Sequence, residues 1–102
     1  MSNRTRLPNR RAAETFTYRC RDQKIDATVS YFPNGRLAEV FLRSGRAGTD
    51  LSITMIELAV AVSLALQHGC SEQVLRAAMP RTEEGKAEGA IGQLLDLLRR
   101  NR

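Results

Sequence analysis

Apolar and polar residues alternate along three short stretches in the first half of the chain. Every odd-numbered residue from Ile25 to Tyr31 is apolar, and every residue between them is polar. A similar period of two runs through residues 15–20 and 36–43, and this period is typical of a half-buried strand. Pro33-Asn34-Gly35 separates the last two stretches and favours a tight hairpin. The pattern therefore predicts antiparallel strands over residues 15–20, 24–32 and 36–43.

The pattern then changes to a long apolar run. Residues 50–68 read DLSITMIELAVAVSLALQH, and only Glu57 and Ser63 are polar between positions 55 and 66. A helix that is apolar on nearly every side is buried in a core or in a membrane. The apolar run is shorter than the ~20 residues needed to span hydrocarbon. We therefore expect this helix to lie inside a small domain, buried on all of its sides, and to make no contact with a membrane.

Two shorter helices are expected after it. Gly69 is suited to end the long helix, and Ser71 to cap a helix over residues 72–79, which Pro80 ends. Residues 81–89 are polar and predict a surface loop, and residues 90–100 have apolar positions at helical spacing. The predicted fold is α+β: a three-stranded antiparallel sheet packed on the buried central helix plus two shorter helices, in the order βββααα.

The charge of the chain is concentrated at its beginning. The 102 residues carry a net charge of +5. Residues 1–13 contain four arginines and no acidic residue, so we expect a flexible basic arm ahead of a single domain over residues 14–100. The arm is either a solvated tail or a phosphate-contacting segment of a small nucleic-acid-binding protein. Its candidate contacts are Arg4, Arg6, Arg10 and Arg11.

The turn before the long helix is a candidate anion-binding site. Free N–H groups and the helix dipole converge at a helix N-terminus, where phosphate groups bind. The candidate residues are Arg43, Gly45, Arg46, Gly48 and Thr49. The alternative is a plain strand-to-helix turn, in which Thr49 or Asp50 supplies the N-cap. A nucleotide is the ligand expected under the first interpretation.

Leu37 and Phe41 fall on the outward face of the third predicted strand. A second layer or a protein partner, including a second copy of the chain, would cover them. The alternative is that they are scattered exposed apolar residues of the ordinary kind.

Residues that would support catalysis are scarce. The chain has one histidine, His68, which suits a capping role at the end of the long helix, and two isolated cysteines, Cys20 and Cys70. The spacing of these residues does not predict a metal site, a cofactor or a catalytic triad or dyad. Glu83 and Glu84 lie in the polar loop, where we expect them to be solvated rather than catalytic. We therefore expect no autonomous enzyme activity, and a reducing cytoplasm as the compartment.

Four runs of residues resemble a known family. They are residues 35–42 (GRLAEVFL), 45–50 (GRAGTD), 63–69 (SLALQHG) and 89–98 (GAIGQLLDLL). In order and spacing they resemble the TSCPD domain, over residues 14–98. This domain occurs near the C-terminus of adenosylcobalamin-dependent ribonucleotide reductases and in small separate proteins, often of phage or prophage origin.

The chain lacks the Thr-Ser-Cys-Pro-Asp motif that gives the family its name. It has Met79-Pro80-Arg81 at the end of the second predicted helix, so no thiol role carries over. The resemblance implies a non-catalytic accessory or regulatory module of nucleotide reduction that binds a nucleotide or a protein partner. The alternatives are a nucleic-acid-binding protein that uses the arm, and a phage-borne interaction module or inhibitor.

Overall fold

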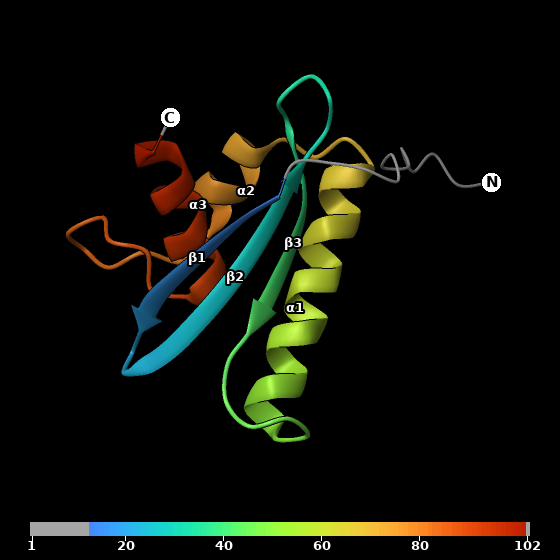
Figure 1. The fold of residues 1–102 in the computed structure, drawn as a ribbon. Helices are drawn as coiled ribbons and strands as arrows, with labels where there is room; N and C mark the ends of the chain where they lie inside the picture. The colour runs from blue at the N-terminus through green and yellow to red at the C-terminus, as the bar shows by residue number, and fades with distance from the viewer. Residues whose placement is uncertain (1–12, 102) are drawn as a thin grey trace.

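The computed structural model describes residues 13–101 and shows a three-stranded sheet with three helices (Figure 1). The elements are β1 (Ala13–Cys20), β2 (Gln23–Tyr31), β3 (Leu37–Arg43), α1 (Asp50–Gln67), α2 (Glu72–Ala78) and α3 (Ala90–Arg100). The predicted α+β class and βββααα order are confirmed, and no predicted boundary differs from these by more than two residues.

The sheet is antiparallel throughout, in the order β1-β2-β3. Arg21 and Asp22 connect β1 to β2 with φ angles of 50° and 67°, so two residues with side chains occupy the left-handed conformation that favours glycine. The predicted hairpin between β2 and β3 is present. Gly35 has a φ of 89°, and its N–H donates to the carbonyl of Phe32 at 2.8 Å. Both connections are thus local, and β1 and β3 form the two edges of the sheet.

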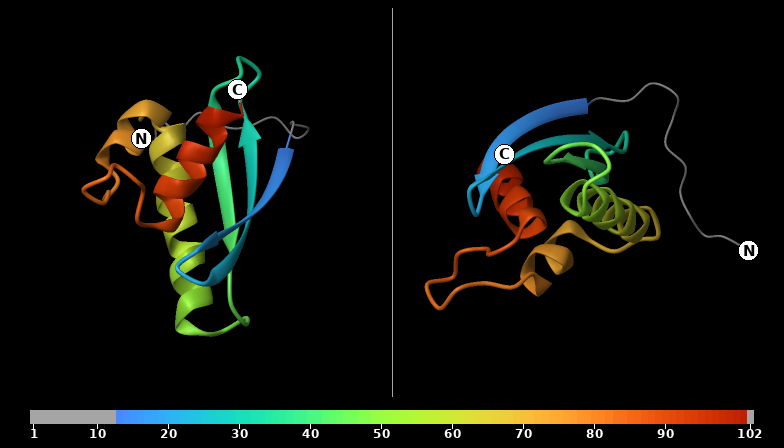
Figure 2. Two further views of the ribbon diagram at one scale, coloured as in Figure 1. Left: turned by 90° about the vertical axis from the view of Figure 1, so that its left-hand side faces the viewer. Right: turned by 90° about the horizontal axis from the view of Figure 1, so that it is seen from below.

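Helix α3 forms the most deeply buried helical face. Its apolar residues recur at helical spacing, and Leu94 and Leu95 are completely buried. Helices α1 and α3 lie on the same side of the sheet, with α2 beyond them (Figure 2). The core is therefore shared between the inner face of the sheet and two helices. Its largest fully buried side chains are those of Ile25, Val29, Val40, Leu66, Leu94, Leu95 and Leu98.

Helix α1 is only partly buried, so the prediction that it is buried on all sides is wrong. Ala59, Val62 and Leu66 face the core, whereas Ile56 and Val60 are 54% and 52% exposed. Helix α3 already occupies much of the inner face of the sheet, and a domain of this size has only one core. By length and composition, α1 is also the one helix within residues 13–101 that is apolar enough to cross a membrane, with a mean hydropathy of 1.5.

Two polar side chains fix α1 to the edge of β3. The hydroxyl of Ser63 accepts a hydrogen bond from the Val40 N–H at 2.9 Å and donates to the Val40 carbonyl at 3.0 Å. Gln67 Nε2 donates to the Ala38 carbonyl at 3.1 Å. An edge strand presents unpaired backbone groups, and buried backbone groups need partners. The polar residues of an otherwise apolar helix thus complete the hydrogen bonding of β3.

Leu37 does not lie on the outward face of β3, and its prediction as an exposed interface residue is wrong. It is only 2% exposed, whereas Phe41 is 57% exposed, as expected. The register of β2 with β3 shifts between Ser30 and Tyr31, so Tyr31 pairs with Leu37 and Ala38 falls at the irregularity. A bulge of this kind breaks the alternation of sides along the strand. Leu37 and Ala38 are therefore both buried.

Candidate functional site

The turn predicted to bind an anion is built around the cap of α1. The Thr49 hydroxyl donates to the carbonyl of Arg46 at 2.7 Å and accepts from the N–H of Ser52 at 3.3 Å. The Thr49 N–H also donates to the Arg46 carbonyl, at 3.2 Å. Thr49 is thus the N-cap, and a phosphate contact by Thr49 would compete with these bonds. Gly45 and Gly48 adopt positive φ angles of 76° and 83°, which gives the turn its shape.

The other predicted residues of this turn are solvent-exposed. Arg43 and Arg46 are exposed at the end of β3 and in the turn. Anion binding by Arg43, Gly45, Arg46, Gly48 and Thr49 stays a prediction. The arm residues Arg4, Arg6, Arg10 and Arg11 lie outside the described residues.

The histidine and the cysteines occupy structural positions. His68 is the C-cap residue of α1, and Gly69 follows with a φ of 99°. Cys20 is buried, and its thiol lies 3.7 Å from the Glu88 carbonyl. Cys70 is partly buried, with its thiol 3.8 Å from the Ser71 carbonyl. Among residues 13–101, no three His, Cys, Asp or Glu side chains are grouped so that they could hold a metal ion.

A bidentate ion pair joins the loop after α2 to helix α3. Arg81 donates to the two carboxylate oxygens of Asp96 at 2.8 and 3.0 Å. It also donates to the carbonyls of Gly85 and Arg76 at 3.0 and 3.2 Å. The hydrogen bond from Arg81 holds the pKa of Asp96 below its ordinary value, and the same bond raises the pKa of Arg81. One guanidinium therefore holds the end of α2, the loop and α3 together.

Three further arginines surround this ion pair. Arg76, Arg99 and Arg100 line the same pocket as Arg81 and Asp96, with a volume of about 500 Å³. Arg76 and Arg100 add to the lowering of the Asp96 pKa, after the larger effect of Arg81. Four arginines and one carboxylate thus line the same pocket, for a formal net charge of +3. We call the surface formed by Arg76, Arg81, Arg99 and Arg100 the basic face.

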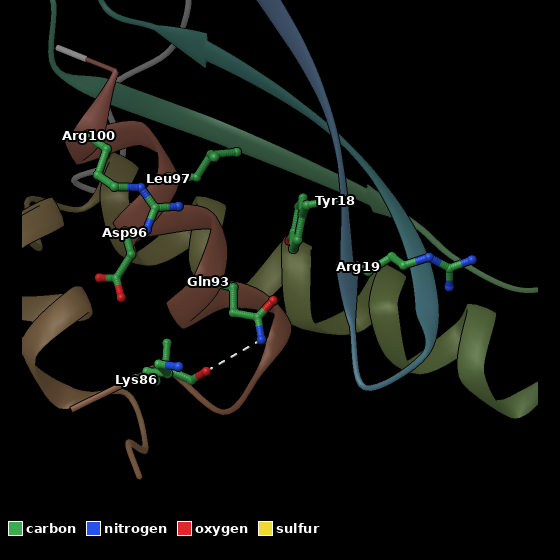
Figure 3. A pocket seen from close by; sticks show the side chains of 8 residues that line it. Tyr18, Arg19, Lys86, Gln93, Asp96, Leu97 and Arg100 are labelled. Atoms are coloured by element: carbon green, nitrogen blue, oxygen red, sulfur yellow. Dashed lines mark hydrogen bonds between the residues drawn. The ribbon is translucent and has the colours of Figure 1, made fainter. Parts of the chain in front are cut away.

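A second pocket of about 370 Å³ adjoins the basic face and shares Asp96 and Arg100 with it (Figure 3). Its wall includes the ring of Tyr18, whose hydroxyl donates to the Ala90 carbonyl at 2.7 Å. Burial, and then the nearby Cys20, raise the pKa of Tyr18, so its phenol stays neutral at physiological pH. Gln93 also lines this pocket, and its Nε2 donates to the Ala87 carbonyl at 3.4 Å.

The side chains that line this second pocket do not all point into it. In Figure 3, Arg19 extends away from the other labelled residues, and its Nη1 donates to the Asp22 carbonyl. Arg100 lies above Asp96 in this view and lines both pockets. The second pocket therefore has the ring of Tyr18 and the amide of Gln93 in its wall, and the guanidinium of Arg100 on the side that it shares with the basic face.

Sequence reasoning missed the basic face because its members are distant in the chain. Arg81 belongs to a polar loop, and Arg99 and Arg100 suit the negative end of the α3 dipole. Nothing in the local pattern predicts that these residues meet at one carboxylate. One signal was present: Asp96 is the only charged residue in the apolar run from Ile91 to Leu98.

Comparisons with known proteins agree with the resemblance seen in the sequence. The family model described as "TSCPD domain" matches residues 3–98 and so begins within the predicted arm. A "Vitamin B12-dependent ribonucleotide reductase" from Agrobacterium fabrum is 33% identical over 66 residues, which are 65% of this chain and 5% of the relative. This chain therefore matches about one twentieth of that relative's length. No solved structure matches the chain. The chain belongs to the TSCPD domain family and is a module related to vitamin B12-dependent ribonucleotide reductase.

Proposed function

We propose that the chain is a non-catalytic accessory module of ribonucleotide reduction that binds the phosphate groups of a nucleotide on its basic face. The observation that carries the proposal is the excess of arginines among the residues that line one pocket, four against a single carboxylate. The relative's name places it in ribonucleotide reduction, and the matching region is a small part of that relative. A ligand-binding role suits such a small region better than the reductase chemistry.

The charge of the basic face supports an anionic ligand. Side chains of Arg76, Arg99 and Arg100 form no ion pair with another described residue, whereas Arg81 is held by Asp96. Like charges gathered at one pocket repel one another, so an anion bound there would be stabilised by several arginines at once. Guanidinium groups also match phosphate oxygens in a bidentate geometry.

The two helices that end at this pocket oppose an anion, and the arginines offset that effect. The C-terminus of a helix carries a partial negative charge. At the end of α2, Arg81 already donates to the Arg76 carbonyl. At the end of α3, Arg99 and Arg100 place positive charge beside the last carbonyls. The formal charge of the residues that line the pocket therefore stays positive.

The adjoining pocket favours a nucleotide over a simple phosphate ion. Tyr18 and Leu97 provide an apolar wall against which a base can pack, and the amide of Gln93 can bond to a base edge. Both volumes, about 370 and 500 Å³, fall in the range of roughly 300–1,000 Å³ that small-molecule sites occupy. Arg100 lines both pockets and so joins a base position to a phosphate position.

Amide chemical-shift titration of the 102-residue chain tests the proposal. Inorganic phosphate and a nucleoside diphosphate are added separately at millimolar concentration. We expect both to shift Arg76, Arg81, Arg99 and Arg100, and only the nucleotide to shift Tyr18 and its neighbours. Arg100→Gln should weaken nucleotide binding by about 10-fold or more, as expected for the loss of one charge-assisted hydrogen bond.

The predicted turn supplies the control for this experiment. Arg46→Gln removes an exposed arginine of the turn before α1 and should leave nucleotide binding unchanged. Shifts confined to residues 45–52, lost in Arg46→Gln and kept in Arg100→Gln, would move the site to that turn. An absence of shifts at the basic face with either ligand would contradict the proposal.

A further inference from the structure

The side of α1 that faces away from the core carries a continuous apolar stripe. Ile53, Ile56, Val60 and Leu64 are 40–54% exposed, and their spacing of three, four and four residues places them along one line of the helix. Phe41 of β3 is 57% exposed and lies across a groove of about 290 Å³ from this line. We call these five residues the apolar stripe.

The apolar stripe has the size of a functional patch. Its five side chains expose on the order of 400 Å² of apolar surface, and the largest apolar patch on a monomer, about 300–600 Å², is often functional. Its groove is also lined by Leu42 and Ala59, which are buried, so the floor of the groove is formed by core residues. A partner seated there would extend the core outward.

We infer that a second copy of this chain covers the apolar stripe, with the two α1 helices antiparallel about a two-fold axis. The four stripe residues of α1 are all aliphatic, and their spacing is nearly the same whether the helix is followed from Ile53 to Leu64 or in the reverse direction. In an antiparallel pair, Ile53 of one copy faces Leu64 of the other, and Ile56 faces Val60. An isologous two-fold contact requires this kind of self-complementary surface.

The ends of α1 also suit an antiparallel pair. The arrangement places the acidic first turn at Asp50 near Gln67 and His68 of the other copy, and the two helix dipoles are antiparallel, which is the favourable side-by-side orientation. Glu57, the one charged residue between Leu51 and His68, is solvent-exposed and falls opposite Ala59 and Val60 of the other copy.

The expected interface reaches the size of a specific one. Two copies of the apolar stripe together bury close to the roughly 1,000 Å² above which an interface is specific, once flanking residues such as Ala61 are included. Helix α1 lies beside the β3 edge of the sheet, whereas α3, which carries two arginines of the basic face, lies toward the β1 edge (Figure 1). Dimerisation therefore leaves the proposed nucleotide site open, and either proposal can fail without the other.

Light scattering on the 102-residue chain across a concentration series tests the inference. The monomer has a mass of 11.4 kDa, and we expect twice that value at the higher concentrations. Val60→Asp should weaken dimerisation on the order of 100-fold, because each dimer would bury two unpaired carboxylates near its centre. Phe41→Asp, on β3, is a second variant for the case in which a charge in α1 disturbs the fold.

The matched control is Val74→Asp, because Val74 is an aliphatic residue of α2 that is 61% exposed and lies outside the stripe. This variant should stay dimeric. Amide spectra of all variants report whether the fold is kept. In a dimer formed from differently labelled copies, we expect intermolecular contacts between the methyl groups of Ile53 and Leu64, which a parallel pair would not give.

Three outcomes would overturn the inference. A chain that stays monomeric at every concentration would do so, and so would a dimer that persists in both Val60→Asp and Phe41→Asp. The third is a monomer that binds phospholipid vesicles through the stripe, because α1 is long and apolar enough to meet a membrane instead.

Discussion

Ser63 offers the sharpest test of how α1 is attached to the sheet. Its hydroxyl is bonded to both backbone groups of Val40, at 2.9 and 3.0 Å, and Val40 is only 1% exposed. Ser63→Ala leaves a buried N–H and a buried carbonyl without a partner. Each such group costs about 1–3 kcal/mol, and the groove beside Ser63 lets water satisfy part of the loss. We expect the free energy of unfolding to fall by about 2–4 kcal/mol.

This loss is large for a chain of this length. A domain of about 100 residues has a free energy of unfolding of roughly 5–15 kcal/mol. With a dependence on urea of about 1–2 kcal/mol per molar, Ser63→Ala should lower the urea midpoint by roughly 1–4 M. Amide hydrogen exchange adds a local measurement. The Val40 N–H should lose most of its protection, whereas the amides of α3 should still exchange only through global unfolding.

Ser52→Ala is the matched control for Ser63→Ala. Ser52 lies in the first turn of the same helix, and its hydroxyl makes no hydrogen bond with a described residue. This variant should stay within about 0.5 kcal/mol of wild type. The reasoning is refuted if the two variants unfold at the same urea concentration, or if Val40 exchanges at the wild-type rate in Ser63→Ala.

Three further predictions concern α3 and its surroundings. The hydrogen bond from Arg81 holds the pKa of Asp96 below the value it has in the unfolded chain. The ionised carboxylate therefore stabilises the fold above the unfolded pKa, and this stabilisation is lost as pH falls through the folded pKa. Between about pH 5 and 2, urea titrations should show a larger loss of stability for wild type than for Asp96→Asn. In the monomer, Leu95→Ala should lower the free energy of unfolding by about 2–5 kcal/mol, and Leu64→Ala, at a position 40% exposed, by less than about 1 kcal/mol. Gly92→Ala would place a Cβ 2.9 Å from a neighbouring side chain, so thermal melts should show a loss of about 1–3 kcal/mol in the free energy of unfolding. The Cβ of Gly89→Ala would meet nothing within 4 Å, so that loss should be only about a few tenths of a kcal/mol. Equal effects within either pair of variants would count against the packing described.

Local signals in the sequence were sufficient to predict most of the elements. Ser71 accepts a hydrogen bond from the Val74 N–H, as its position before a helical pattern indicated. The predicted bounds of α3 are those of the structure, because its apolar residues define one face without ambiguity. Alternation and the hairpin turn were likewise enough for the three strands.

The errors arose where distant residues decide the outcome. The apolarity of α1 shows that it can be buried, but how much of it is buried depends on α3, which competes for the same face of the sheet. The burial of Leu37 depends on a register shift against β2. The basic face depends on Arg81 meeting Asp96 across 15 residues of chain. No periodicity within one segment contains this information.

The attachment of α1 to β3 also determines how the sheet can grow. Ser63 occupies both outward backbone groups of Val40, and Gln67 occupies the carbonyl of Ala38, so an incoming strand cannot pair along that part of β3. The opposite margin of the sheet, formed by β1, carries no helix along it (Figure 1). Any extended peptide that joins this sheet by β-augmentation, or any fibril-forming contact, must therefore begin at β1.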